Sequence, residues 1–181
     1  MPRLIHLNGP PAIGKSTLAR RYADDHPGVL CWDVDVVRTL VGGWSHDYAG
    51  AGALVRPLAL AGIRAWLDEG RDVVLPQLLA DPVEHARFRA AATDVGADPV
   101  HVLLTDEVEA AVERFHLRTA WGVDPHAGVA ARAVDEAGGD ELLRDYHQRL
   151  TALAGSTPTT VLHSRAGDVE GTYAALRDVL G

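Results

Sequence analysis

The chain has 181 residues, the length of one domain with a substantial core and little room for a second. Its formal net charge of −8 and pI near 5.5 argue against a basic surface for a nucleic-acid backbone and favour small, soluble partners. The single cysteine, Cys31, rules out an internal disulfide, and no apolar run approaches the roughly 18 residues of a membrane span. The first strand starts too early to leave room for a signal peptide. We therefore expect a cytoplasmic protein without a membrane partner.

Short apolar runs alternate with helical stretches along the chain. We expect strands at 3–8, 29–32, 72–76, 99–104 and 159–163, and helices at 15–26, 54–69, 139–154 and 168–180. Buried strands separated by helices indicate an α/β fold with a parallel sheet covered on both faces, a three-layer αβα sandwich. Because ligands of such sheets bind beyond the carboxyl ends of the strands, the residues after the first three strands are the candidates for chemistry.

The first strand runs into the segment 9–16, Gly-Pro-Pro-Ala-Ile-Gly-Lys-Ser, which has the G-x-x-x-x-G-K-[ST] spacing of a phosphate-binding loop. Lys15 is the only lysine of the chain. Its retention in an arginine-rich sequence indicates a need for a compact ammonium that reaches phosphate oxygens. The following helix adds its positive N-terminus, and Ser16 would place its hydroxyl on Mg²⁺. The residues predicted to bind the nucleotide here are Gly9, Pro10, Pro11, Ala12, Ile13, Gly14, Lys15, Ser16 and Thr17.

Two carboxylates leave the second strand as Asp33-Val34-Asp35. Residues two apart point to the same side as long as the backbone stays extended. We predict that Asp35 takes the proton of an acceptor hydroxyl and that Asp33 holds a metal-bound water. The alternative is that either aspartate only caps the next helix.

Glycine and proline mark two loops, 42–52 and 121–128. Each is either a plain surface loop or a mobile cover, the first a flap over the substrate and the second part of a lid. Trp44 and Tyr48 in the first loop would suit a bulky acceptor.

Nine histidines are scattered along the sequence without the paired spacing of metal ligands. We therefore expect no dedicated transition-metal site.

The phosphate loop followed by Asp-x-Asp at 33–35 resembles the small-molecule kinases of the P-loop superfamily, such as shikimate kinase, gluconate kinase and chloramphenicol phosphotransferase, which are often labelled AAA family ATPases. Nucleoside monophosphate kinases are their relatives. The resemblance extends over the order of elements of the whole chain and is specific at the phosphate loop. It implies one P-loop kinase domain over 1–181, a five-stranded sheet in the order 2-3-1-4-5, ATP with Mg²⁺, and a helical lid around 114–132 that carries arginines.

The resemblance also implies roles for three arginines. Arg118 would stabilise the transferring phosphoryl group, as a catalytic residue beside Lys15 and Asp35, with Arg114 next to it on the nucleotide. Both could instead form a solvated helix face. Arg165 follows the fifth strand, in the loop that cradles adenine in these kinases.

Gln77 stands where many P-loop NTPases carry a Walker B carboxylate, which argues against a motor-type ATPase. Its amide could hydrogen-bond the acceptor instead.

The favoured function is ATP-dependent transfer of the γ-phosphoryl group to a hydroxyl of a metabolite or antibiotic. A nucleoside or nucleoside monophosphate kinase is the first alternative, because Asp35-Val36-Val37-Arg38 resembles the Asp-x-x-Arg that grips an acceptor phosphate. A phosphorylated acceptor is favoured if Arg38, Arg56 and Arg64 line the pocket, and a neutral one if they point outward. A non-catalytic ATP-binding module is the second alternative, and it would leave Asp35 without a role.

Overall fold

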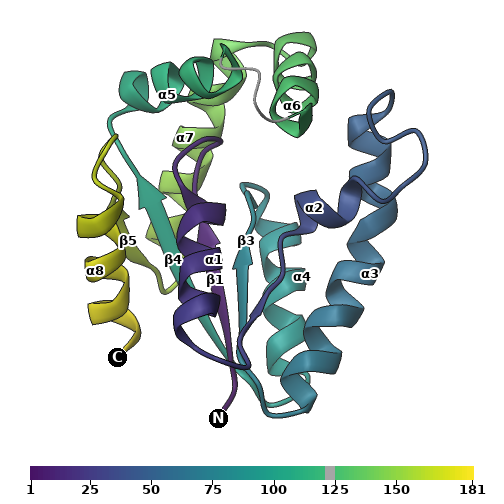
Figure 1. The fold of residues 1–181 in the computed structure, drawn as a ribbon, viewed down its shortest axis with the longest axis vertical. Coiled ribbons are helices and arrows are strands. Elements are labelled where there is room, and N and C mark those ends of the chain that lie inside the picture. Colours follow the sequence, from purple (N-terminus) through teal and green to yellow (C-terminus); the bar gives the residue numbers. More distant parts are fainter. Residues whose placement is uncertain (121–124) are drawn as a thin grey trace.

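The computed structural model describes residues 1–120 and 125–181 and is built on a five-stranded sheet (Figure 1). The strands are β1 (Arg3–Asn8), β2 (Leu30–Cys31), β3 (Val73–Pro76), β4 (Asp98–Thr105) and β5 (Thr160–His163). They pair in parallel in the order β2-β3-β1-β4-β5, which confirms the predicted order. The helices are α1 (Lys15–Asp25), α2 (Val34–Arg38), α3 (Tyr48–Asp68), α4 (Pro82–Thr93), α5 (Val108–Ala120), α6 (Pro125–Glu136), α7 (Asp140–Ser156) and α8 (Val169–Leu180).

The alternation of side chains along β1 divides the core between two faces of the sheet. Ile5 and Leu7 pack under α1 and α8, whereas Leu4 packs with α3 and α4 on the other face. Helix α7 joins that second face through Leu150, which packs with Leu103 of β4. The result is the predicted three-layer αβα sandwich. Among the described residues, no helix is both long enough and apolar enough to cross a membrane.

Helices α5 and α6 lie beyond the carboxyl ends of the strands, over the phosphate loop (Figure 1). They occupy the place predicted for the lid. Residues 121–124 of the predicted second loop lie outside the described residues, and the rest of that loop, from residue 125 on, begins helix α6. The predicted loop is therefore in part helical.

The first predicted loop is also shorter than expected. Helix α3 begins at Tyr48 because the side chain of Asp47 accepts a hydrogen bond from Gly50 N, 2.8 Å away, and caps the helix. Helix α4 was not predicted at all, although its start carries a readable signal. Asp81 accepts hydrogen bonds from the amides of Val83 and Glu84, and Pro82 occupies the first turn.

Gly9 joins β1 to the phosphate loop at a point where no side chain fits. A Cβ atom at this position would lie 2.4 Å from the carbonyl oxygen of Leu104 in β4, and the backbone has a φ of +149°. We expect Gly9→Ala to lower the free energy of unfolding by about 2–4 kcal/mol, because a backbone carbonyl cannot move aside.

Urea denaturation measures this loss, with Gly155→Ala as the matched control. Gly155 lies in α7, where an added Cβ would meet no atom within 4 Å. The control is expected to be neutral or to stabilise by up to about 1 kcal/mol. Equal stability of Gly9→Ala and the wild type would contradict the close approach.

Candidate active site

A cavity of about 800 Å³ opens beyond the carboxyl ends of the strands, and residues of α5 and α6 form part of its lining. Ligand pockets typically measure about 300–1,000 Å³, so this cavity lies in the upper part of that range. The sheet brings most of the predicted site residues to its wall, namely Pro11, Ala12, Gly14, Lys15, Ser16, Thr17, Asp33, Asp35, Arg38, Gln77 and Arg118.

The phosphate loop leaves the first turn of α1 open to an anion. Its N-cap is Gly14, in a left-handed conformation with φ +103°, and no side chain caps the amides that follow. The first turn holds no acidic residue either. Uncapped N–H groups at a helix N-terminus form a ready anion site. Ile13 is fully buried and anchors the loop in the core, which leaves the backbone and Lys15 to face the cavity.

The Lys15 ammonium is folded over this loop. Nζ donates to the carbonyl oxygens of Gly9, at 2.9 Å, and Pro10, at 2.8 Å. Burial, with a smaller effect of the Arg118 charge, lowers the pKa of Lys15 to about 8, against the opposing effect of Asp35 and Asp33. A dianionic phosphate bound beside Lys15 would offset the free-energy cost of burying its positive charge.

Arg114 supports the loop from the side away from the cavity. Its Nη2 donates to Ile13 O at 3.1 Å, and Nη1 donates to Ser164 O and pairs with Asp106 at 3.3 Å. Ser164 adds a hydrogen bond from Oγ to the same Ile13 carbonyl at 2.9 Å. Arg114 thus ties the phosphate loop to the ends of β4 and β5. Its direct contact with a nucleotide stays a prediction.

Asn8 is the residue of this region that the sequence analysis missed. It is fully buried at the end of β1, and its Oδ1 accepts from the amides of Gly9, at 2.9 Å, and Leu79, at 3.0 Å. Nδ2 donates to Leu79 O at 3.0 Å. One side chain therefore joins the start of the phosphate loop to the segment after β3. A buried asparagine at the end of an otherwise apolar strand was the signal available in the sequence.

Asp33 and Asp35 share the cavity for a different reason from the one expected. The chain does not stay extended, because Asp33 caps α2 by accepting from Asp35 N at 3.1 Å. The cap uses one oxygen of Asp33, and the other lies 3.9 Å from Arg20 Nη2. Both carboxylates still line the cavity. Asp33 is therefore the cap of α2, and its role toward a metal ion stays a prediction.

Arg38, Tyr48 and Gln77 also line the cavity. The Arg38 guanidinium lies over the Tyr48 ring at 3.9 Å, and its Nη2 is 3.1 Å from Asp35 Oδ1. Burial raises the pKa of Tyr48, so its hydroxyl keeps its proton. Within the described part of the chain, Gln77 Oε1 and Arg38 Nε and Nη1 are buried without hydrogen-bond partners. These unused polar atoms are the ones a bound molecule could satisfy.

Other predicted residues lie at or beyond the edge of this cavity. Arg56 lines it and pairs with Glu84 at 3.0 Å, whereas Arg64 pairs with Asp94 and is not on the wall that the described residues form. Neither Trp44 nor the exposed Arg165 belongs to the described wall. Their ligand contacts stay predictions.

Ser16 and Asp33 fit a magnesium ion by their chemistry. Mg²⁺ prefers oxygen ligands and is usually held by one or two carboxylates together with the phosphates of a substrate. The Ser16 hydroxyl and the Asp33 oxygen that does not cap α2 belong to residues that line the cavity with Lys15, although Arg20 also faces that oxygen.

Comparison with known proteins agrees with this geometry. The family model described as AAA domain matches residues 4–142. The structure resembles a protein provisionally described as a kinase from Chloroflexus aurantiacus, with a TM-score of 0.72 at 19% identity, covering 99% of this chain and 94% of that one. It also resembles the tunicamycin resistance protein of Deinococcus radiodurans (TM-score 0.61) and a gluconokinase from Sinorhizobium meliloti (TM-score 0.60), each at 19% identity, 99% coverage of this chain and 95% of the other.

No curated protein matches the sequence significantly. The likeness to solved structures at this level of identity shows the fold alone, and the family match extends over more than half of the chain. The chain belongs to the AAA domain family and has the P-loop fold that the small-molecule kinases share.

Proposed function

We propose that this protein is an ATP-dependent phosphotransferase that moves the γ-phosphoryl group to a hydroxyl of a small molecule, a metabolite or an antibiotic. The observation that carries the proposal is the single cavity that holds both halves of such a reaction. Lys15 and the start of α1, which no side chain caps, line this cavity together with Asp35, Arg38 and Gln77.

The donor half binds and positions the triphosphate. Backbone amides of the loop and the Lys15 ammonium would hold its phosphates, and the Arg118 side chain on α5 lies near enough to Lys15 to lower its pKa. Mg²⁺ held by Ser16 and Asp33 would, when bound, neutralise phosphate charge. The positive charges are thus arranged before the substrate arrives, and this arrangement stabilises charge on the transferring group.

The acceptor half needs a base beside a pocket for the acceptor. Asp35 is 34% exposed, lines the cavity, and is positioned by Arg38. It would take the proton of the attacking hydroxyl, while the unpartnered Gln77 Oε1 accepts a hydrogen bond from a second polar group of the acceptor. Alanines of α6 and the rings of Phe115 and Tyr146 give the rest of the wall an apolar surface, which favours an acceptor with a sizeable apolar part.

The unused donors of Arg38 favour a second candidate, a nucleoside or nucleoside monophosphate kinase. A buried guanidinium with two unpartnered nitrogens can bind a phosphate of the acceptor. Arg56 stands on the same wall, although each of the two arginines already faces a carboxylate. Assays of ATP consumption with hydroxyl compounds, nucleosides and nucleoside monophosphates separate the candidates. Arg38→Met should raise KM more for a phosphorylated acceptor than for a neutral one, whereas any effect through the position of Asp35 should lower kcat for both.

Asp35→Asn is expected to lower kcat by about 100-fold to 10,000-fold, because an amide cannot take the hydroxyl proton. ATP affinity, measured by calorimetry, should stay within about threefold, since Asp35 is assigned to the acceptor. Asp178→Asn, an exposed change on α8, is the matched control and should behave like the wild type. Retained turnover in Asp35→Asn would remove the base from the proposal, and a chain that binds ATP without any turnover would support the non-catalytic alternative.

Nucleotide affinity should fall above pH 8. The free chain holds Lys15 at a pKa of about 8, and phosphates favour the ammonium, so binding takes up a proton once Lys15 is neutral. We expect the affinity for ADP, titrated without magnesium, to be flat below about pH 7 and to fall about tenfold per unit above pH 8. Lys15→Met should bind more weakly and lose this slope; an equal slope in both proteins would assign the effect to another group.

A further inference from the structure

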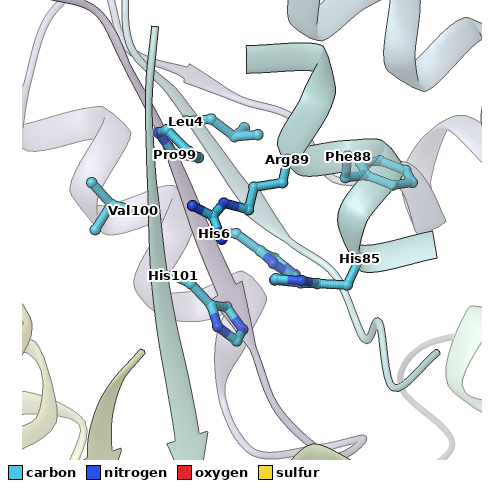
Figure 2. A pocket seen from close by; sticks show the side chains of 8 residues that line it. All are labelled: Leu4, His6, His85, Phe88, Arg89, Pro99, Val100 and His101. Carbon is cyan, nitrogen blue, oxygen red and sulfur yellow. The ribbon is translucent and has the colours of Figure 1, made fainter. Parts of the chain in front are cut away.

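Three histidines that are far apart in the sequence meet in the core between the sheet and α4 (Figure 2). His6 of β1 and His101 of β4 are direct partners in the sheet register, and His85 projects from α4. One ring nitrogen of each lies within 4.8 Å of the other two, and all three residues are buried. The expectation from sequence spacing, that the histidines are scattered, does not hold for this histidine cluster, because the sheet register brings the three together.

Hydrogen bonds fix which nitrogens of the cluster carry protons. His6 Nε2 lies 2.8 Å from the Gln77 carbonyl and must donate to it, which leaves the lone pair on Nδ1. His101 Nδ1 lies 2.8 Å from Thr159 Oγ1, whose own proton goes to Thr157 O at 2.8 Å. His101 therefore donates through Nδ1 and keeps its lone pair on Nε2. A protein acceptor on the remote nitrogen is the usual arrangement of metal-binding histidines.

The cluster is uncharged. Burial lowers the pKa of His6 well below its usual range, and burial together with His85 and Arg89 lowers the pKa of His101 to about 3. The pKa of His85 is also lowered, mainly by burial. Neutral imidazole is the form that binds a metal, so no proton has to be displaced.

A small cavity of about 10 Å³ lies among these rings, room for a sphere the size of one water molecule or one ion. Zinc–nitrogen bonds of about 2.0–2.1 Å would place the nitrogens about 3.4 Å apart, so the rings would close by up to about 1.4 Å on binding. Arg89 lines the same cavity (Figure 2), and its charge opposes a bare dication. A hydroxide or similar small anion in the fourth position would offset that charge.

We propose that His6, His85 and His101 bind one transition-metal ion that prefers imidazole ligands, Zn²⁺ being the representative, in a site separate from the nucleotide cavity. Three histidines with one open position form a common zinc ligand set. The set contains no carboxylate, which disfavours Mg²⁺ and Ca²⁺. The ion would replace the 3.2 Å contact between His101 Nε2 and Asn8 Nδ2.

The test is a calorimetric titration of the metal-stripped full chain with Zn²⁺ in the absence of nucleotide. We expect one ion per chain. In His85→Gln the Zn²⁺ affinity should be lower by about 100-fold or more, because losing a metal ligand costs more affinity than losing a residue that only hydrogen-bonds a ligand, which typically costs about 10-fold to 100-fold. The imidazole of His85 makes no hydrogen bond with the described part of the chain, so the variant should fold, with His85→Ala as a second version. His46→Ala, an exposed change, is the matched control.

Two further measurements keep the result specific. Asp33→Asn should bind Zn²⁺ like the wild type, which separates this site from the oxygen ligands beside the phosphate loop. Co²⁺ in the wild-type chain should give the intense visible absorption of four-coordinate nitrogen ligation, lost in His85→Gln. Three results would overturn the proposal. They are the absence of stoichiometric Zn²⁺ binding, a Zn²⁺ affinity of both His85 variants equal to that of the wild type, and a cobalt spectrum typical of octahedral coordination.

Discussion

The buried amide of Asn8 is the interaction on which the geometry of the site depends. Where β1 ends and the phosphate loop begins, the Gly9 amide and both backbone polar groups of Leu79 need partners away from water. Asn8 supplies all three, at 2.9–3.0 Å. An unpaired buried backbone group costs about 1–3 kcal/mol of stability, so these hydrogen bonds hold the phosphate loop at a fixed distance from the segment after β3. The donor and acceptor halves of the cavity are thereby one rigid unit at their base.

The same side chain connects the nucleotide cavity to the histidine cluster. Asn8 Nδ2 contacts His101, and the Gln77 carbonyl accepts from His6, so two of the three polar contacts of the cluster lead to segments that carry site residues. A polar network inside a sheet is costly unless every member is satisfied. Here β1 and β4, which end at the site, also carry two of the three imidazoles, so the packing of the histidine cluster constrains the position of the strand ends.

What could be predicted from sequence was local. The glycine spacing of the loop and the alternation of strands and helices identify the phosphate site and the class of fold, because a few adjacent residues carry each signal. The roles of Asn8, Arg114 and His85 depend on partners distant in the chain, such as the Ile13 carbonyl that Arg114 reaches. No spacing rule contains such pairings. The missed helix α4 is different, because an N-cap aspartate, Asp81, followed by Pro82 is a local signal for the start of a helix.

The presence of one lysine in an arginine-rich chain now has a structural reason. The ammonium of Lys15 donates to two consecutive carbonyls of a tight loop, in a place where burial already lowers its pKa. A planar guanidinium presents its donors in a fixed fork and stays charged at every accessible pH. It could not direct one compact donor group at both carbonyls. Arginines instead occupy positions that use several donors or the flat face of a guanidinium. Arg114 bonds two carbonyls and a carboxylate, and the Arg38 guanidinium lies over the Tyr48 ring.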